Sequence, residues 1–309
     1  MVKPLDPARE QALGGVYAFT AYLMWGFLPL YFLLLQPTGA WELVAWRIVF
    51  SLAVCAALLT VLRTWKRLFA ILRNRWLTGW TVVAGILIYV NWQVFVIGTF
   101  TGHIIETSLG YFINPIVTVL LGVLVLHERL RTTQWVAIGI ASLAVVVIVV
   151  GYGSFPWIAL TLAASFGLYG LVKKQIGPSV DAVSGMTLES LWLLPVAVVQ
   201  LIVVGATTGL TLGNVSAGHT ALLLCTGVAT ATPLLFFAAA ARRAPLTVIG
   251  MLQFLAPVMQ FITGFWLQGE PMPLERWIGF GLVWVALIVL TADSLRAHQR
   301  PTLVEPGIE

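Results

Sequence analysis

The chain has 309 residues, of which 60% are hydrophobic and only 9% are charged, and its mean hydropathy is +0.96. Soluble domains carry roughly 25% charged residues, so the composition excludes a soluble domain and predicts a polytopic, all-α protein embedded in a lipid bilayer. The net charge of +5 does not indicate a nucleic-acid partner, because the basic residues lie in short stretches between apolar runs. The two cysteines lie inside apolar runs, so we expect no disulfide framework.

A membrane-spanning helix needs about 20 predominantly apolar residues. By this rule the sequence predicts ten spans, at residues 11–35, 41–62, 77–99, 104–126, 133–151, 156–172, 183–205, 216–241, 245–268 and 275–293. Residues 1–10 and 297–309 are polar and are expected to form short tails. The first apolar run is longer than that of a signal peptide, so we expect it to remain in the membrane.

The basic residues are distributed unequally between the two sides of these spans. Of the 17 Lys and Arg residues, all but Arg47 and Arg276 lie in the tails or in loops on the same side as the tails. Cytoplasmic loops of membrane proteins are enriched in Lys and Arg. The pattern therefore predicts that both termini are cytoplasmic.

The two halves of the chain share a weak internal repeat. At an offset of 142 residues, six identities align: Phe112 with Phe254, Pro115 with Pro257, Gly122 with Gly264, Glu128 with Glu270, Trp135 with Trp277 and Gly139 with Gly281. The halves, 11–151 and 156–293, hold five predicted spans each, so the second would enter the membrane from the opposite side. Inverted repeats are common in secondary transporters; chance matching of apolar sequence is the alternative.

Polar residues recur on one face of the predicted fourth and ninth spans. Spacings of three and four place residues on one helical face. They connect Thr107, Tyr111, Asn114 and Thr118 in the fourth span, and Gly250, Gln253, Pro257, Gln260 and Gly264 in the ninth. Polar side chains are costly against lipid and turn toward the protein interior. Both faces are therefore predicted to line a central cavity, with close helix packing as the alternative.

Pro115 and Pro257 occupy equivalent positions in the two repeats. A proline inside a helix removes one backbone hydrogen bond and leaves the carbonyl four residues earlier without its partner. Here those carbonyls belong to Tyr111 and Gln253. We expect both spans to bend at these positions, either as gating elements or as static kinks that shape the packing.

Arg47 and Glu189 lie a few residues inside predicted spans, where a charge is costly, and Glu106 begins the fourth span. They are candidates for contact with a substrate or a coupling proton, and hydrogen bonding between helices is the alternative. Glu128 and Glu270 fall at predicted helix C-termini, where the helix dipole disfavours a carboxylate. We expect neighbouring arginines to offset that charge, which would make both glutamates structural anchors.

Amide and aromatic side chains in other spans complete the candidate cavity. Asn91 and Trp92 lie in the middle of the third span, and amides at this depth must find partners. Tyr169 lies in the sixth span. The sequence has no metal-ligand spacing, nucleotide-binding loop or recognised catalytic motif. We therefore expect no catalytic residue, no metal and no cofactor.

The sequence resembles the RarD branch of the EamA family, in the drug/metabolite transporter superfamily. The resemblance rests on SLGYFINP at 108–115, HERL at 127–130, WELVAWR at 41–47, YGLVKK at 169–174 and ESLWLLP at 189–195. His127 departs from the pattern, since family members usually carry glycine there. The resemblance implies ten helices in two inverted five-helix repeats and cytoplasmic termini. It also implies outward carriage of small metabolites through a cavity built from spans one, three, four, six, eight and nine.

These patterns together predict a secondary-active transporter of the inner membrane. It would export a small metabolite, amino-acid-like or drug-like, by alternating access through a central cavity. With no nucleotide motif, energy would come from a substrate gradient or from protons, carried by Glu106 or Glu189. The alternatives are a channel-like facilitator and a membrane enzyme or lipid-handling protein. No motif indicates an oligomeric state.

Overall fold

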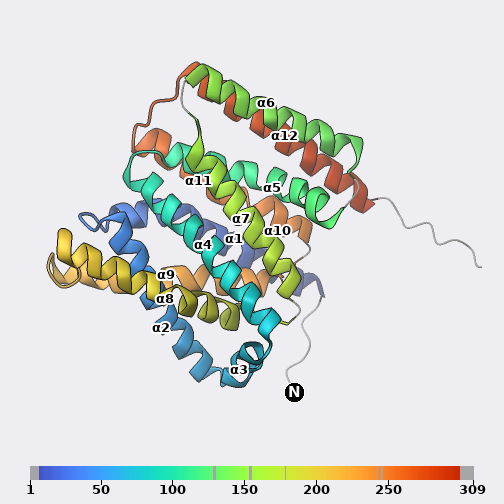
Figure 1. The fold of residues 1–309 in the computed structure, drawn as a ribbon. Coiled ribbons are helices and arrows are strands. Elements are labelled where there is room, and N and C mark those ends of the chain that lie inside the picture. The colour runs from blue at the N-terminus through green and yellow to red at the C-terminus, as the bar shows by residue number, and fades with distance from the viewer. Residues whose placement is uncertain are drawn as a thin grey trace, which may run out of the picture.

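The computed structural model describes residues 7–127, 130–152, 155–177, 179–241, 243–244 and 246–299, and its regular structure is helical throughout (Figure 1). In chain order the helices are α1 (Pro7–Leu33), α2 (Ala40–Val61), α3 (Trp65–Arg73), α4 (Arg75–Phe100), α5 (Ile104–Leu126), α6 (Thr132–Tyr152), α7 (Trp157–Ile176), α8 (Ala182–Thr207), α9 (Ala217–Ala241), α10 (Leu246–Leu252), α11 (Leu255–Ile262), the π-helical η1 (Thr263–Leu267) and α12 (Leu274–Gln299).

Eight of these helices are long and apolar enough to cross a membrane: α1, α2, α4, α5, α6, α8, α9 and α12. Each coincides with one of the predicted spans to within a few residues, apart from the longer ends of α1 and α12. The other two predicted spans coincide with α7 and with the segment from α10 to η1. The helix α7 ends in Lys173 and Lys174, which lower its hydropathy, and the second segment is interrupted.

The short helix α3 is absent from the predicted elements, because its basic residues indicated a loop. Leu68 and Ile71 are buried on one side of α3, whereas Lys66, Arg67 and Arg73 are exposed. A short basic helix with one apolar face is typical of a segment that lies along a membrane surface. The sequence signal for it was the spacing of three between Leu68 and Ile71.

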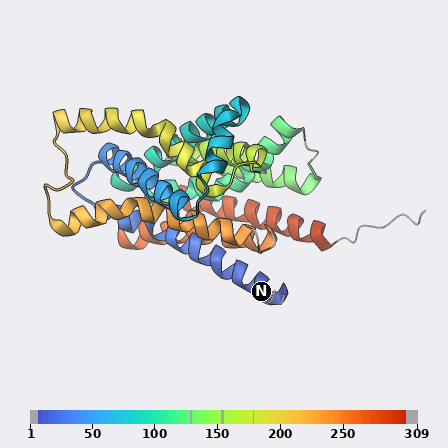
Figure 2. The same ribbon diagram turned by 90° about the horizontal axis from the view of Figure 1, so that it is seen from below.

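The helices pack as two outer pairs with a middle layer of helices between them. The helices α6 and α12 lie side by side at one edge, and α2 packs on α8 at the other (Figure 1). Between them, α7 contacts both α4 and α5, and α1 contacts both α9 and α11. The axes of most long helices are roughly aligned, and successive helices such as α8 and α9 run in opposite directions (Figure 2). Residues in the middle layer can therefore face one another across helices that are distant in sequence.

The ninth predicted span is divided, whereas its counterpart α5 is one helix through Pro115. The interruption lies between α10 and α11 and begins at Gln253, the residue whose carbonyl Pro257 leaves without a helical partner. The hydroxyl of Ser108 on α5 donates to the carbonyl oxygen of Pro257 at 2.8 Å. The two prolines thus occur in different backbone settings, a continuous helix and a broken one.

The carboxylate of Glu270 binds the N-terminus of a neighbouring helix. Glu270 accepts hydrogen bonds from the backbone N–H groups of Ile104 and Ile105, at the start of α5. Helix N-termini favour negative charge, so the N-terminus of α5 stabilises the carboxylate of Glu270. Glu128 lies outside the described residues.

Glu270→Gln is expected to lower the stability of the protein by about 1–2 kcal/mol, because an amide keeps one acceptor oxygen but loses the charge at the α5 N-terminus. Thermal unfolding of the purified protein in detergent, followed by tryptophan fluorescence, measures the change. Glu10→Gln is the matched control, since Glu10 is exposed in the first turn of α1. Equal melting temperatures for the two variants would contradict the capping role.

Candidate functional site

A hydrogen-bonded group of side chains joins three helices in the middle of the molecule. The amide nitrogen of Asn91, on α4, donates to the carbonyl oxygen of Leu162 and to the hydroxyl of Ser165 on α7, both at 3.2 Å. The hydroxyl of Tyr111, on α5, donates to the amide oxygen of Asn91 at 3.0 Å. Asn91 is only 2% exposed. We call Asn91, Tyr111 and Ser165 the central cluster; two of its members are predicted cavity residues.

Aromatic side chains extend from the central cluster along α7. The ring centroid of Tyr111 lies 5.9 Å from that of Phe166, and Phe166 lies 6.0 Å from Tyr169. On the other side, Tyr111 is 5.8 Å from Phe95 on α4. Tyr111 and Tyr169 are half-buried. The predicted cavity residues Tyr111 and Tyr169 are therefore linked by one row of rings.

Arg47, on α2, is a buried cation held mainly by aromatic rings. Its guanidinium carbon lies 4.2 Å from the ring centroid of Trp92 and 5.4 Å from that of Phe32. Its Nε donates to the hydroxyl of Thr230, on α9, at 2.8 Å. The residue is 4% exposed. Within the described ranges, the ion pairs found do not involve Arg47.

Glu189, on α8, is the counterpart of Arg47 in the proposed repeat and has partners of its own. Its carboxylate accepts from the ammonium group of Lys173 at 2.8 Å and from the hydroxyl of Tyr169 at 3.1 Å. Glu189 is buried, and the side chain of Lys173 is 27% exposed. Lys173 was expected in a cytoplasmic loop, but it lies on α7, one turn after Tyr169.

Glu106 lies at the opposite end of α7 from this ion pair. Its carboxylate accepts from the backbone N–H groups of Ile158 at 2.9 Å and of Ala159 at 3.4 Å. It therefore caps the N-terminus of α7, where the helix dipole favours a negative charge. The three ionisable candidates are thus separated: Glu106 binds backbone, Glu189 binds Lys173, and Arg47 packs on rings.

The polar faces of α5 and α11 contain two buried amide oxygens without a protein partner. The amide oxygen of Asn114 has no hydrogen bond among the described residues, and neither has that of Gln260, which is 2% exposed. Asn114 lies close to Gly167 of α7. Gln253 is half-buried at the break before α11. Thr118 is exposed, and its hydroxyl donates to the carbonyl of Asn114 within α5, so it does not join the central cluster.

Sequence reasoning did not identify the partners of these residues. Thr230 bears the hydroxyl that binds Arg47. It shares a helical face with Thr226, at a spacing of four, and that polar face was a candidate part of the cavity, but the pattern did not indicate Arg47 as its partner. Phe32 and Phe166 gave no signal beyond their apolar character. These contacts cross between helices, and the rotation of each helix about its own axis cannot be read from periodicity alone.

Comparison with known proteins agrees with this architecture. A model of the EamA-like transporter family matches residues 12–150. Protein RarD of Streptomyces exfoliatus is 46% identical over 292 residues, 94% of this chain and 92% of that protein. Protein RarD of Escherichia coli K12 is 35% identical, over 95% and 98% of the two chains. The uncharacterized transporter YojE of Bacillus subtilis 168 is 39% identical, over 93% and 96%.

A crystal structure of a protein that is 17% identical in sequence superposes with a TM-score of 0.60, covering 93% of this chain and 99% of the other. This similarity shows that the two proteins share a fold. A bundle of membrane-spanning helices with polar side chains converging in its interior is typical of a multi-pass membrane transporter. The chain belongs to the EamA-like transporter family, and proteins called RarD are among its relatives. It is a transporter and not an enzyme.

Proposed function

We propose that the protein is a secondary-active carrier that exports a small metabolite by alternating access through a pathway between α4, α5, α7 and α11. The observation that carries this proposal is the pair of buried amide oxygens of Asn114 and Gln260. An unpaired buried acceptor is costly, and it is expected where a polar solute binds in passing. The neighbouring central cluster supports the same pathway.

The proposed architecture has ten crossings in two inverted repeats, 11–151 and 156–293, with α7 and the segment from α10 to η1 as the remaining two crossings. The helix boundaries support it. Four pairs of helices begin 142 residues apart: α2 and α8, α4 and α9, α5 and α10, and α6 and α12. In addition, α2 packs on α8 and α6 on α12. Contacts between equivalent helices are expected around a two-fold axis.

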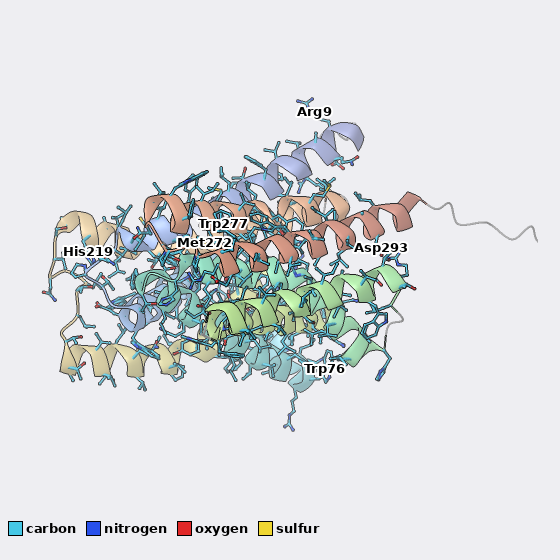
Figure 3. All side chains as sticks on the ribbon, turned by 90° about the horizontal axis from the view of Figure 1, so that it is seen from above. Arg9, Trp76, His219, Met272, Trp277 and Asp293 are labelled. Carbon is cyan, nitrogen blue, oxygen red and sulfur yellow. The ribbon has the colours of Figure 1, made fainter. Side chains whose placement is uncertain are left out.

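The proposed orientation puts both tails, 1–10 and 297–309, in the cytoplasm of the cell. Figure 3 places Arg9 and Asp293 toward one end of the bundle and His219 at the other. The end near Arg9 would be cytoplasmic under the positive-inside rule. The turn between α7 and α8 lies at this same end, because the connection from α8 to α9 leads to His219. We propose that the Lys173–Glu189 ion pair closes the pathway there.

Protons are the proposed coupling ion, with Glu189 as their carrier. Glu106 is the weaker candidate, since its carboxylate is occupied by the N-terminus of α7. Glu189 faces Lys173 and Tyr169, so protonation would release the contact between α7 and α8. Transport by Glu189→Gln is expected to lose its pH dependence, and transport by Glu106→Gln to keep it. If Glu106→Gln lost the pH dependence and Glu189→Gln kept it, Glu106 would be the proton carrier.

Transport in everted membrane vesicles tests the proposed function. Vesicles that contain the protein are expected to accumulate at least one solute from a broad panel of labelled metabolites faster than vesicles without it. The flux should saturate, and preloading with unlabelled solute should accelerate it. Flux that neither saturates nor responds to preloading would instead identify a channel-like facilitator. No transport of any panel member would contradict the proposal.

A further inference from the structure

We propose that Arg47 binds the carboxylate of the transported solute, so that the solute is a monocarboxylate with an apolar or aromatic body. This inference rests on the proposed function, because it names the substrate class of the same pathway. It starts from a buried positive charge that no carboxylate of the described residues neutralises.

A buried charge without a counter-ion is costly in a protein interior and more so at membrane depth. Other buried carboxylates and cations in this protein have partners: Glu189 pairs with Lys173, and Glu270 binds two backbone N–H groups. Among the described residues, Arg47 contacts the Thr230 hydroxyl and the faces of Trp92 and Phe32, and no carboxylate. Cation–π contacts offset a part of the desolvation cost. A bound anion would offset the rest.

The contacts of Arg47 fix its orientation and leave its outer edge available. Nε donates to Thr230, and Trp92 covers a face of the guanidinium. Neither terminal nitrogen has a hydrogen-bond partner among the described residues. Their parallel N–H groups match the two oxygens of a carboxylate in a bidentate pair. Phe32, which contacts Arg47, lies 6.1 Å from Phe95, and Phe95 lies 5.8 Å from Tyr111, so the anion would lie near the central cluster.

The charges nearby favour one negative charge on the solute, and the amide oxygens of Asn114 and Gln260 could accept from an uncharged hydroxyl or N–H group on its body. A single guanidinium matches a carboxylate, whereas a phosphate monoester carries up to two negative charges at neutral pH. The carboxylates of Glu106 and Glu189 already have partners, so neither is free to bind an ammonium group. The rings of Phe32, Trp92 and Tyr111 would contact an apolar body. A simple aromatic acid therefore fits better than a cationic or phosphorylated solute.

Ligand-dependent thermal unfolding of the full-length protein in detergent tests this inference. Phenylacetate is the probe, with phenylacetamide, phenethylamine and phenyl phosphate as neutral, cationic and phosphorylated analogues. Phenylacetate is expected to raise the melting temperature of the wild type at concentrations at which the three analogues have no effect. Arg47→Lys should bind it at least about tenfold more weakly, because an ammonium group cannot pair with both oxygens. Arg47→Gln should not respond.

Arg131→Gln is the control, since Arg131 pairs with Asp293 at a partly exposed position away from Arg47. It should respond to phenylacetate as the wild type does. Without ligand, Arg47→Gln is expected to melt at the same or a higher temperature, because it removes an uncompensated charge; a much lower value would show a structural role and overturn the inference. The inference would also be overturned if the wild type responded to the cationic analogue alone, or if Arg47→Gln responded to phenylacetate as strongly as the wild type does.

Solute counterflow in proteoliposomes separates this inference from the proposed function. Saturable counterflow of phenylacetate that Arg47→Gln loses would support both. Counterflow of a cationic or neutral solute that is unchanged in Arg47→Gln would overturn the carboxylate site and leave the carrier intact. Absence of counterflow for every solute, with binding of phenylacetate retained at Arg47, would support the site and contradict the carrier.

Discussion

Glu189→Gln is expected to destabilise the protein by about 3 kcal/mol, because it leaves the ammonium group of Lys173, which is mostly buried, without its counter-ion. The ion pair joins α7 to α8 at 2.8 Å, and the side chain of Glu189 is 5% exposed. Removing one partner of a buried pair costs far more than the pair contributes. The double variant Lys173→Met with Glu189→Gln should regain most of the lost stability. Thermal unfolding in detergent measures both changes.

The ion pair between Arg131 and Asp293 is the matched control, since the side chain of Arg131 is 48% exposed. Exposed pairs contribute about 1 kcal/mol or less, so Arg131→Gln should lower the melting temperature only slightly. If Glu189→Gln and Arg131→Gln had equal effects, the pair between α7 and α8 would not be the buried contact described here. Failure of the double variant to recover would point to a separate role of Glu189 through Tyr169.

Gly227→Val is expected to separate α2 from α9 and to abolish transport. A Cβ at Gly227 would lie 2.5 Å from the carbonyl carbon of Phe50 and closer still to its oxygen, and the backbone of α2 cannot yield as a flexible side chain would. Overpacking of this kind costs about 1–3 kcal/mol. Gly227 also lies one turn before Thr230, and Phe50 lies one turn after Arg47. Separation of the helices would therefore break the hydrogen bond between Arg47 and Thr230.

Gly218→Ala is the control for this variant, because it lies on the same helix and a Cβ there meets no atom within 4 Å. Its melting temperature and transport rate should match those of the wild type. Gly227→Ala should lie between the two, since it adds the Cβ alone. Normal transport by Gly227→Val would show that the α2–α9 contact is looser than the structure indicates.

The spans could be predicted from the sequence because each depends on a local property, a run of apolar residues. Eight helices confirm those predictions, and the helix that begins at Leu246 starts within one residue of its predicted span. The short helix α3 was missed because its charges concealed the apolar face formed by Leu68 and Ile71. The break at Gln253 was predicted only as a bend, since proline chemistry indicates where a helix weakens and not whether it separates.

The candidate site was less predictable, because its contacts join residues far apart in sequence. Burial of polar residues could be anticipated, and Asn91 and Tyr111 do meet. The capping of α7 by Glu106 could not, since the segment it binds is about 50 residues away and its distance depends on how α5 packs on α7. Likewise, the surroundings of Arg47, which include no carboxylate of the described residues, depend on the rotation of several helices, and hydrophobic periodicity does not define that rotation.

Labelling of a single cysteine at position 114 from each side of the membrane tests alternating access most directly. The background would carry Cys55→Ser and Cys225→Ser, which remove both native cysteines. Asn114→Cys is expected to react with a membrane-impermeant maleimide in right-side-out and in everted vesicles. Adding Glu189→Gln, which weakens the proposed cytoplasmic closure, should raise the rate in everted vesicles and lower it in right-side-out vesicles. No labelling from either side, or rates that rise together, would contradict a carrier that opens to one side at a time.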